Sequence, residues 1–101
     1  MTGQDIRNRR LTGGAKFDLG RTLITPGAQA DLDPRDVAAC LTRHARGDWG
    51  ECCPEDSREN DYSLPRRLRL LSVYRDRNGA KFWVITEADR SATTVLLPDE
   101  Y

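Results

Sequence analysis

The chain has 101 residues, of which 38% are hydrophobic and 32% are charged, and sixteen basic and sixteen acidic residues give a formal net charge of zero. This length and composition predict one polar globular domain with a single modest core. No apolar run is long enough to span a bilayer, and the start of the chain lacks the hydrophobic segment of a signal peptide. We therefore expect a cytoplasmic protein with no membrane partner.

The charges are unevenly distributed along the chain. Residues 1–30 hold five basic and two acidic side chains, residues 31–65 hold four and nine, and residues 66–101 hold seven and five. The first fifteen residues have almost no apolar content, and they include Arg7, Arg9 and Arg10. They predict a flexible basic arm, residues 1–15, ahead of a single domain, residues 16–101. The arm is either a solvated leader or a contact for nucleic acid or an acidic protein.

The first predicted elements are a strand and a helix. Residues 17–24 have a strand pattern with a bend at Gly20, and Thr25 followed by Pro26 is suited to start a short helical turn. A longer helix is predicted over residues 34–46, because Asp33 is a good N-cap and Pro34 a good first residue. Its apolar stripe consists of Val37, Cys40, Leu41, His44 and Ala45.

An acidic segment follows this helix. Trp49 lies in a short loop as an aromatic anchor, and Pro54 begins an acidic helix whose first-turn carboxylates complement the helix dipole. We expect this helix to lie on the surface, to be held through Tyr62 and Leu64, and to end at Leu64-Pro65.

Residues 68–97 predict a three-stranded antiparallel meander. Asn78-Gly79 suits a two-residue type I′ turn, which would place Tyr74 opposite Trp83 and Val73 opposite Val84. A four-residue loop over residues 88–91 would place Thr86 opposite Thr93 and Val84 opposite Val95. With the strand at residues 17–24, the prediction is an α+β fold: one four-stranded, mainly antiparallel sheet with two or three short helices.

The predicted register gives the meander two faces. The core face would hold Leu71, Val73, Phe82, Val84, Val95 and Leu97. The second face is also apolar and would hold Leu70, Ser72, Tyr74, Trp83, Ile85, Thr94 and Leu96. Either the N-terminal half of the chain covers this second face, or it is a partner surface or homodimer face centred on Tyr74 and Trp83.

Candidate reactive groups are few. Cys40, His44, Cys52 and Cys53 could supply ligands for zinc, but their spacing is that of no common zinc module, and the odd number of cysteines disfavours a disulfide framework. A cysteine nucleophile with His44 as base is a further alternative. The sequence contains no phosphate-binding loop, metalloprotease motif or nucleophile elbow. We expect no catalytic residue and no cofactor.

Basic residues also allow a nucleic-acid alternative. Arg67 and Arg69 could contact phosphates beside aromatic side chains that stack on bases. Asp76 and Glu87 interrupt this surface, and the chain has no net positive charge.

Several segments together resemble a family of small uncharacterised bacterial proteins found on plasmids and other mobile elements. They are residues 23–28 (Leu-Ile-Thr-Pro-Gly-Ala), His44 with residues 46–50, Asn60, residues 70–74 and residues 83–98, which include Ile-Thr-Glu-Ala-Asp-Arg. The resemblance covers about residues 17–101 and supplies no catalytic residue. Some members are labelled restriction–modification subunits, but this chain is short and lacks methyltransferase motifs.

The resemblance implies a mobile-element accessory protein that acts by protein–protein interaction, such as an inhibitor of a host defence complex of the anti-CRISPR or anti-restriction type. Its partner would be a host nucleic-acid-processing complex, because an acidic patch can mimic phosphates at a basic channel. The expected contact residues are Trp49, Glu55, Asp56, Glu59, Tyr74, Trp83 and Ile85. The alternatives are a small nucleic-acid-binding accessory protein and, third, a thiol- or metal-dependent enzyme.

Overall fold

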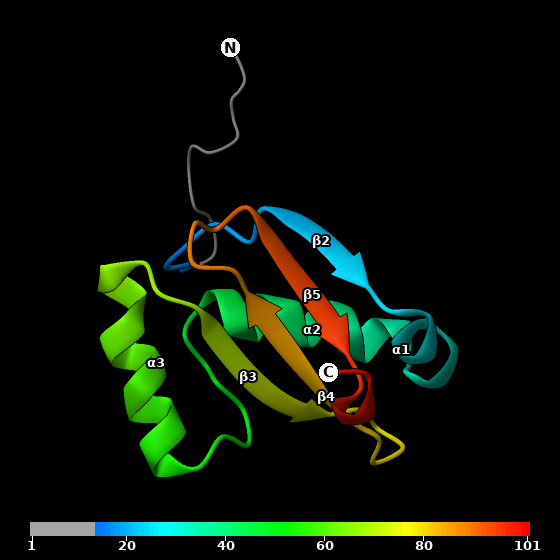
Figure 1. Cartoon of the computed structure of the whole chain (residues 1–101). Coiled ribbons are helices and arrows are strands. Elements are labelled where there is room, and N and C mark those ends of the chain that lie inside the picture. Colours follow the sequence, from blue (N-terminus) through cyan, green and yellow to red (C-terminus); the bar gives the residue numbers. More distant parts are fainter. Residues whose placement is uncertain (1–13) are drawn as a thin grey trace.

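The computed structural model describes residues 14–101, which form one four-stranded sheet with three α-helices (Figure 1). The strands are β2 (Arg21–Ile24), β3 (Leu70–Arg75), β4 (Lys81–Thr86) and β5 (Ala92–Leu96), and their order in the sheet is β2-β5-β4-β3. β2 is parallel to β5, whereas β5 with β4 and β4 with β3 are antiparallel. The predicted α+β fold with a mainly antiparallel sheet is confirmed.

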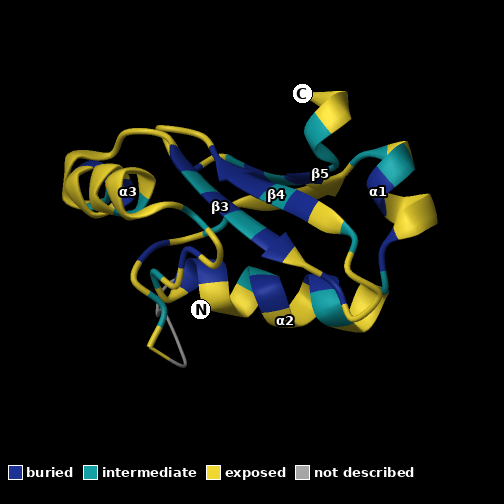
Figure 2. Ribbon diagram, turned by 90° about the horizontal axis from the view of Figure 1, so that it is seen from below, coloured by how far each residue is buried: buried dark blue, intermediate teal, exposed yellow. Residues whose placement is uncertain are grey.

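The helices lie on one face and at one edge of the sheet. α2 (Pro34–Ala45) covers one face, α1 (Pro26–Asp31) lies beside the ends of β2 and β5, and α3 (Pro54–Arg66) lies alongside the β3 edge (Figures 1 and 2). A short 3-10 turn, η1 (Pro98–Glu100), lies on the opposite face near the C-terminus (Figure 2). None of these helices in residues 14–101 is long and apolar enough to cross a membrane.

Local capping explains where α1 and α2 begin. The Thr25 hydroxyl accepts a hydrogen bond from the Ala28 N–H (3.3 Å), and the Asp33 carboxylate accepts one from the Arg35 N–H (2.9 Å). In both helices a proline occupies the first position, where its missing N–H has no intrahelical partner to lose. The predicted helix over residues 34–46 is therefore confirmed to within one residue.

The predicted strand over residues 17–24 is too long. β2 begins only at Arg21, because Gly20 has a left-handed φ of 65° and the backbone there passes against the β4–β5 turn. A Cβ at Gly20 would lie 2.4 Å from the Ser91 carbonyl oxygen.

Two predictions about α3, its last residue and the role of Tyr62, are wrong. It continues to Arg66, since Pro65 falls in the last turn, and it ends where Arg67 takes a left-handed φ of 54°. Tyr62 is 54% exposed and does not hold the helix, whereas Asn60 and Ser63 are buried against the sheet.

The β3–β4 turn is one residue longer than the sequence predicts. Tyr74 pairs with Phe82, and the Asp76 N–H donates to the Ala80 carbonyl (3.0 Å) across a three-residue loop. Gly79 has a φ of 83° and takes the left-handed position of that loop. The buried Asp76 carboxylate stabilises the wider loop by accepting hydrogen bonds from the N–H groups of Asn78 (2.9 Å), Ala80 (3.0 Å) and Asp33 (3.0 Å).

A shift of one residue moves every side chain of β3 to the other face. Leu70, Ser72 and Tyr74 therefore face the core, and the prediction that Leu71 and Val73 do so is wrong. The β4–β5 register is confirmed, with Thr86 opposite Thr93 and Val84 opposite Val95.

The core lies between the sheet and the two covering helices. One cluster joins helix residues to the inner face of the sheet and contains Ala28, Leu32, Val37, Cys40, Tyr74, Phe82, Val84 and Val95. A smaller cluster of Phe17, Trp49 and Leu70 fills the end of the core near α3. The N-terminal half thus covers the face that holds Tyr74. On the other face, the Trp83 ring contacts the Tyr101 ring at a centroid distance of 5.4 Å.

Candidate binding surfaces

The β3 edge of the sheet is closed by other parts of the chain. The Asn60 side chain accepts a hydrogen bond from the Leu71 N–H (3.1 Å) and donates one to the Leu71 carbonyl (2.7 Å). Val73 is the next residue of β3 whose backbone groups point away from β4. Its N–H donates to the Trp49 carbonyl (3.2 Å), and its carbonyl accepts from the Glu51 N–H (2.6 Å). The backbone groups that an edge strand would offer to another strand are thereby occupied at both residues.

The β2 edge is open within residues 14–101. The N–H groups of Arg21 and Thr25 donate to the Ser91 and Val95 carbonyls, at 3.0 Å each. Because backbone groups alternate in direction along a strand, the N–H and C=O groups of Thr22 and Ile24 point away from β5. All four residues of β2 are exposed.

An apolar hollow adjoins this open edge. Its volume is about 460 Å³, and it is lined by Ile24, Gln29, Leu32, Pro34, Val37, Ala38 and Leu41. Ile24 is 40% exposed and shares the core-side face of the sheet with Val95, so its side chain borders the hollow. Leu23 is equally exposed, at 39%, but belongs to the opposite face. Main-chain donors and acceptors and a side-chain hollow thus occur together at this edge.

Three of the predicted contact residues are buried. Tyr74, Trp49 and Ile85 are 1%, 5% and 3% exposed. The Tyr74 hydroxyl donates to the Asp48 carbonyl (2.5 Å), and the Trp49 indole N–H donates to the Asp61 carboxylate (2.9 Å). Tyr74 and Trp49 are packed in the core, and Ile85 is packed on the opposite face of the sheet, so none of the three is accessible to a partner and the prediction that they form a contact surface is wrong.

Trp83 is half-buried and separate from Tyr74. The two residues lie on opposite faces of the sheet, because the longer β3–β4 turn shifts the register. The surface centred on both residues, predicted for a partner or a homodimer, does not exist in this fold. Arg69 lies on the Trp83 side, where it donates to the Tyr101 hydroxyl (2.9 Å).

The acidic residues predicted for partner contact are accessible. Glu55, Asp56 and Glu59 are all exposed on α3. Asp56 and Glu59 also line a hollow of about 220 Å³ beside β3 that includes Arg69.

Of the predicted basic residues, the structure describes Arg67 and Arg69, which have different partners. Arg7, Arg9 and Arg10 lie outside the described residues. Arg67 donates to the Asp89 carbonyl (3.1 Å) at the tip of the β4–β5 hairpin, whereas Arg69 contacts Tyr101.

The candidate reactive groups are also dispersed. Cys40 is buried, Cys52 half-buried and Cys53 exposed, and burial raises the pKa of the Cys40 and Cys52 thiols. Within residues 14–101, no three His, Cys, Asp or Glu side chains are grouped closely enough to hold a metal ion. The structure therefore does not bring Cys40, His44, Cys52 and Cys53 together as a set of ligands.

His44 instead belongs to a buried chain of hydrogen bonds. Its Nδ1 lies 2.5 Å from the Ser72 hydroxyl, and its Nε2 lies 2.8 Å from the Thr86 hydroxyl. Thr86 in turn contacts the Thr93 hydroxyl (2.7 Å), which donates to the Leu19 carbonyl (2.7 Å). Because a carbonyl can only accept, one consistent pattern has Thr86 donating to Thr93 and the His44 Nε2–H donating to Thr86. His44 is then neutral and accepts from Ser72 at Nδ1.

Ser72 and His44 are residue types that can act as nucleophile and base, but this pair is not accessible to a substrate. Both residues have 0% exposure, and the described hollows are lined by other residues. Burial, followed by the charge of Arg90, lowers the pKa of His44 to about 3. The pair can order the core, but a substrate cannot approach it.

Sequence reasoning missed the residues that distinguish the two edges. Asn60 belongs to no hydrophobic pattern that would mark it as a buried residue. The open β2 edge depends on a parallel pairing between residues about 70 positions apart. Thr25-Pro26 indicates where β2 ends, but it does not indicate which strand lies next to β2.

Comparison with known proteins adds no relative. The chain matches no protein-family model, no curated protein and no solved structure.

Proposed function

We propose that this chain is a non-enzymatic accessory protein that binds another protein, taking an extended segment of its partner as an added strand at the β2 edge. The observation that carries the proposal is the difference between the two sheet edges. The β3 edge is closed by Asn60, Trp49 and Glu51, whereas β2 leaves the backbone groups of Thr22 and Ile24 free of a neighbouring strand within residues 14–101. Strand addition uses such backbone groups for affinity.

The apolar hollow supplies the specificity in this proposal. Alternate side chains of an added strand point to the same face of the sheet as Ile24, and one apolar side chain of the partner would enter the hollow. The volume of about 460 Å³ is ample for a leucine or an aromatic ring. The acceptable partner is thus an extended segment with an apolar anchor residue.

Affinity capture from a bacterial lysate, with and without nuclease, tests the proposal. The baits are the wild-type chain, Ile24→Lys and the matched control Leu23→Lys. Both variants place the same charge on the same strand, but only Ile24 faces the hollow. We expect a stoichiometric protein that survives nuclease, is lost with Ile24→Lys and is retained by Leu23→Lys.

Other outcomes would contradict the proposal. Equal capture by Ile24→Lys and the wild type would remove the β2 edge as the contact. Loss of every bound component after nuclease treatment would favour the nucleic-acid alternative instead.

The resemblance to mobile-element proteins supports a host defence complex as the partner, with the chain acting as its inhibitor. The exposed carboxylates of Glu55, Asp56 and Glu59 support a second contact in which α3 mimics nucleic-acid phosphates. Reversing all three charges to lysine changes no described hydrogen bond. The triple variant should keep its fold and lose affinity for the captured complex, and unchanged affinity would remove the mimicry part of the proposal.

A further inference from the structure

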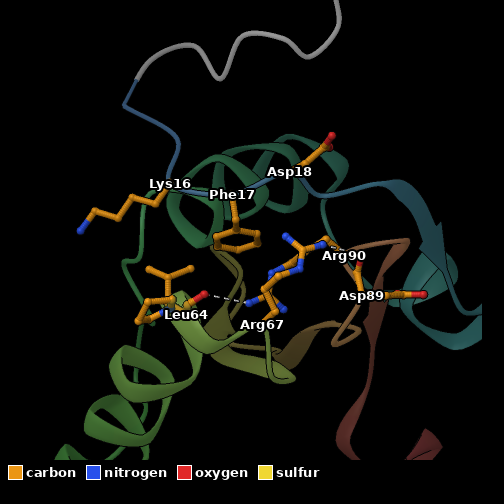
Figure 3. Close-up of a pocket in the computed structure, with 8 residues that line it drawn as sticks. Lys16, Phe17, Asp18, Leu64, Arg67, Asp89 and Arg90 are labelled. Carbon is orange, nitrogen blue, oxygen red and sulfur yellow. Dashed lines mark hydrogen bonds between the residues drawn. The ribbon is translucent and has the colours of Figure 1, made fainter.

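A second hollow, separate from the β2 edge, lies where three distant segments meet. Its volume is about 720 Å³, and it is formed by the residues before β2, the C-terminal end of α3 and the tip of the β4–β5 hairpin (Figure 3). Its apolar wall consists of Phe17, Leu64 and Pro65, and its cationic side chains are Lys16, Arg67 and Arg90.

Arg90 brings a buried positive charge to the wall of this hollow. It is 6% exposed, and its guanidinium donates to the carbonyls of Leu68 (2.7 Å), Leu64 (3.2 Å), Glu87 (3.2 Å) and Ala88 (3.3 Å). Within residues 14–101, it makes no ion pair with a carboxylate. Arg67 lines the same hollow, and burial, followed by the charge of Arg67, lowers the pKa of Arg90.

The acidic residues at the hollow are directed elsewhere. The Asp18 carboxylate accepts from the Gly20 N–H and the Asp89 carboxylate accepts from the Ser91 N–H, both at 3.0 Å. Figure 3 shows both carboxylates pointing outward. The Arg90 guanidinium carbon lies 5.5 Å from the centroid of the Phe17 ring. Hydrogen bonds from Ser91, and to a smaller extent the charge of Arg67, lower the pKa of Asp89. The hollow keeps an excess of positive charge.

The backbone adds an independent observation. Arg67 and Arg90 are the two non-glycine residues with a positive φ in residues 14–101, at 54° and 63°. The left-handed conformation costs about 1 kcal/mol for such a residue, and glycine would avoid this cost. The carbonyl contacts of Arg90 account for an arginine there. Arg67 is exposed, and among the residues that the structure describes its guanidinium donates one hydrogen bond, to the Asp89 carbonyl, so most of its donors are available to a ligand.

We infer that this hollow binds a small organic phosphate with a planar ring, of the mononucleotide class. Arg67 contacts the phosphate, because a guanidinium offers paired donors that match phosphate oxygens. The charge of Arg90 contributes from the wall, while Leu64 and Pro65 offer an apolar surface for the ring. The Lys16 side chain points away from the hollow (Figure 3), and the Phe17 ring is 7% exposed and already contacts Trp49 and Arg90. The volume is within the range of small-molecule sites.

The test is titration of the ¹⁵N-labelled full chain with adenosine monophosphate, followed by NMR at low salt. Inorganic phosphate and adenosine are titrated separately, so that binding of the phosphate group and binding of the ring are measured independently. We expect the monophosphate to shift the amides of Phe17, Arg67 and Arg90, with weaker binding of phosphate at the same residues and the weakest binding of adenosine.

Arg67→Asn is the diagnostic variant, since asparagine tolerates the left-handed conformation and should leave the fold intact. It should weaken binding of the monophosphate about tenfold. Thermal unfolding reports whether the variant is folded. The matched control is Arg58→Asn on the exposed part of α3, which should bind as the wild type does.

Three results of these titrations would overturn the inference, and a fourth would come from an oligonucleotide. They are the absence of shifts at millimolar monophosphate, shifts confined to residues away from the hollow, and unchanged affinity in folded Arg67→Asn. Binding of a single-stranded oligonucleotide at these residues without binding of the mononucleotide would also overturn it, by assigning the surface to nucleic acid.

Discussion

His44 shows how one residue can appear reactive in a sequence and be structural in the fold. It lies on the apolar stripe of α2, has 0% exposure, and contacts the Phe17 and Trp49 rings edge-on at centroid distances of 5.3 and 5.6 Å. Both ring nitrogens have hydroxyl partners on the sheet, so the neutral imidazole satisfies the polar groups of Ser72 and Thr86 inside the core. Protonation would leave a buried charge without a carboxylate among those contacts.

This environment predicts acid-sensitive stability. The pKa of His44 falls from 6.5 to about 3 on folding, so below about pH 6.5 the unfolded chain binds a proton that the folded chain does not. The free energy of unfolding should therefore decrease as the pH falls, by about 1.4 kcal/mol per pH unit. Urea denaturation between about pH 4.5 and 6.5, above the usual range of carboxylates, measures this slope.

The control for this slope is His44→Gln, since the chain has one histidine. The variant is expected to be less stable at every pH but to lack the slope. A wild-type stability that is constant across this interval would show that His44 is protonated in the folded state.

At the scale of elements, Asn60 joins α3 to β3. Its side chain takes the place of a neighbouring strand at Leu71, and it is 5% exposed. Asn60→Ala removes two hydrogen bonds, leaving the Leu71 N–H without a partner and the Leu71 C=O with only the weak thiol donor of Cys52 (3.3 Å). We expect the free energy of unfolding to fall by about 2–4 kcal/mol, measured by urea denaturation.

Asn78→Ala is the matched control for this change. Asn78 is exposed, and the turn uses only its backbone N–H, so its replacement should alter stability by no more than about 0.5 kcal/mol. Similar losses in both variants would mean that the Asn60 bonds do not hold α3.

The β3–β4 turn gives a second prediction at this scale. Gly79 has a φ of 83°, and a Cβ there would meet nothing within 4 Å, so a side chain would cause backbone strain without a clash. Gly79→Ala should reduce the free energy of unfolding by about 1–2 kcal/mol, and Gly79→Asn by less, because asparagine tolerates this conformation. Equal stability of the alanine variant and the wild type would contradict the three-residue loop.

The same turn explains which elements could be predicted from sequence. α1 and α2 begin at Thr25-Pro26 and Asp33-Pro34, where the capping groups are adjacent in sequence and a local pattern is sufficient. The β3–β4 register depends on Asp76, whose carboxylate also accepts from the Asp33 N–H, 43 residues earlier. No local pattern contains that contact, and the resulting one-residue error moved Tyr74 from the core to a predicted binding face.

The candidate site was less predictable than the fold for the same reason. The exposure of Glu55, Asp56 and Glu59 follows from the acidic pattern of α3. The open edge at β2 arises from its parallel pairing with β5, and the hollow beside Ile24 requires α1 and α2 to be in place. Both features depend on contacts between segments far apart in the chain, which residue spacing does not encode.

At the scale of the whole molecule, the difference between the two sheet edges can be measured in the free protein by amide hydrogen exchange. The N–H groups of Leu71 and Val73 donate to the Asn60 side chain and the Trp49 carbonyl, and the Thr25 N–H donates to Val95. These amides should exchange slowly, whereas those of Thr22 and Ile24, which point away from β5, should exchange almost as fast as in an unfolded chain. In complex with the proposed partner, Thr22 and Ile24 should become protected while Leu71 and Val73 change little. Slow exchange at Thr22 and Ile24 in the dilute free protein would mean that this edge is already covered, and it would remove the basis for strand addition there.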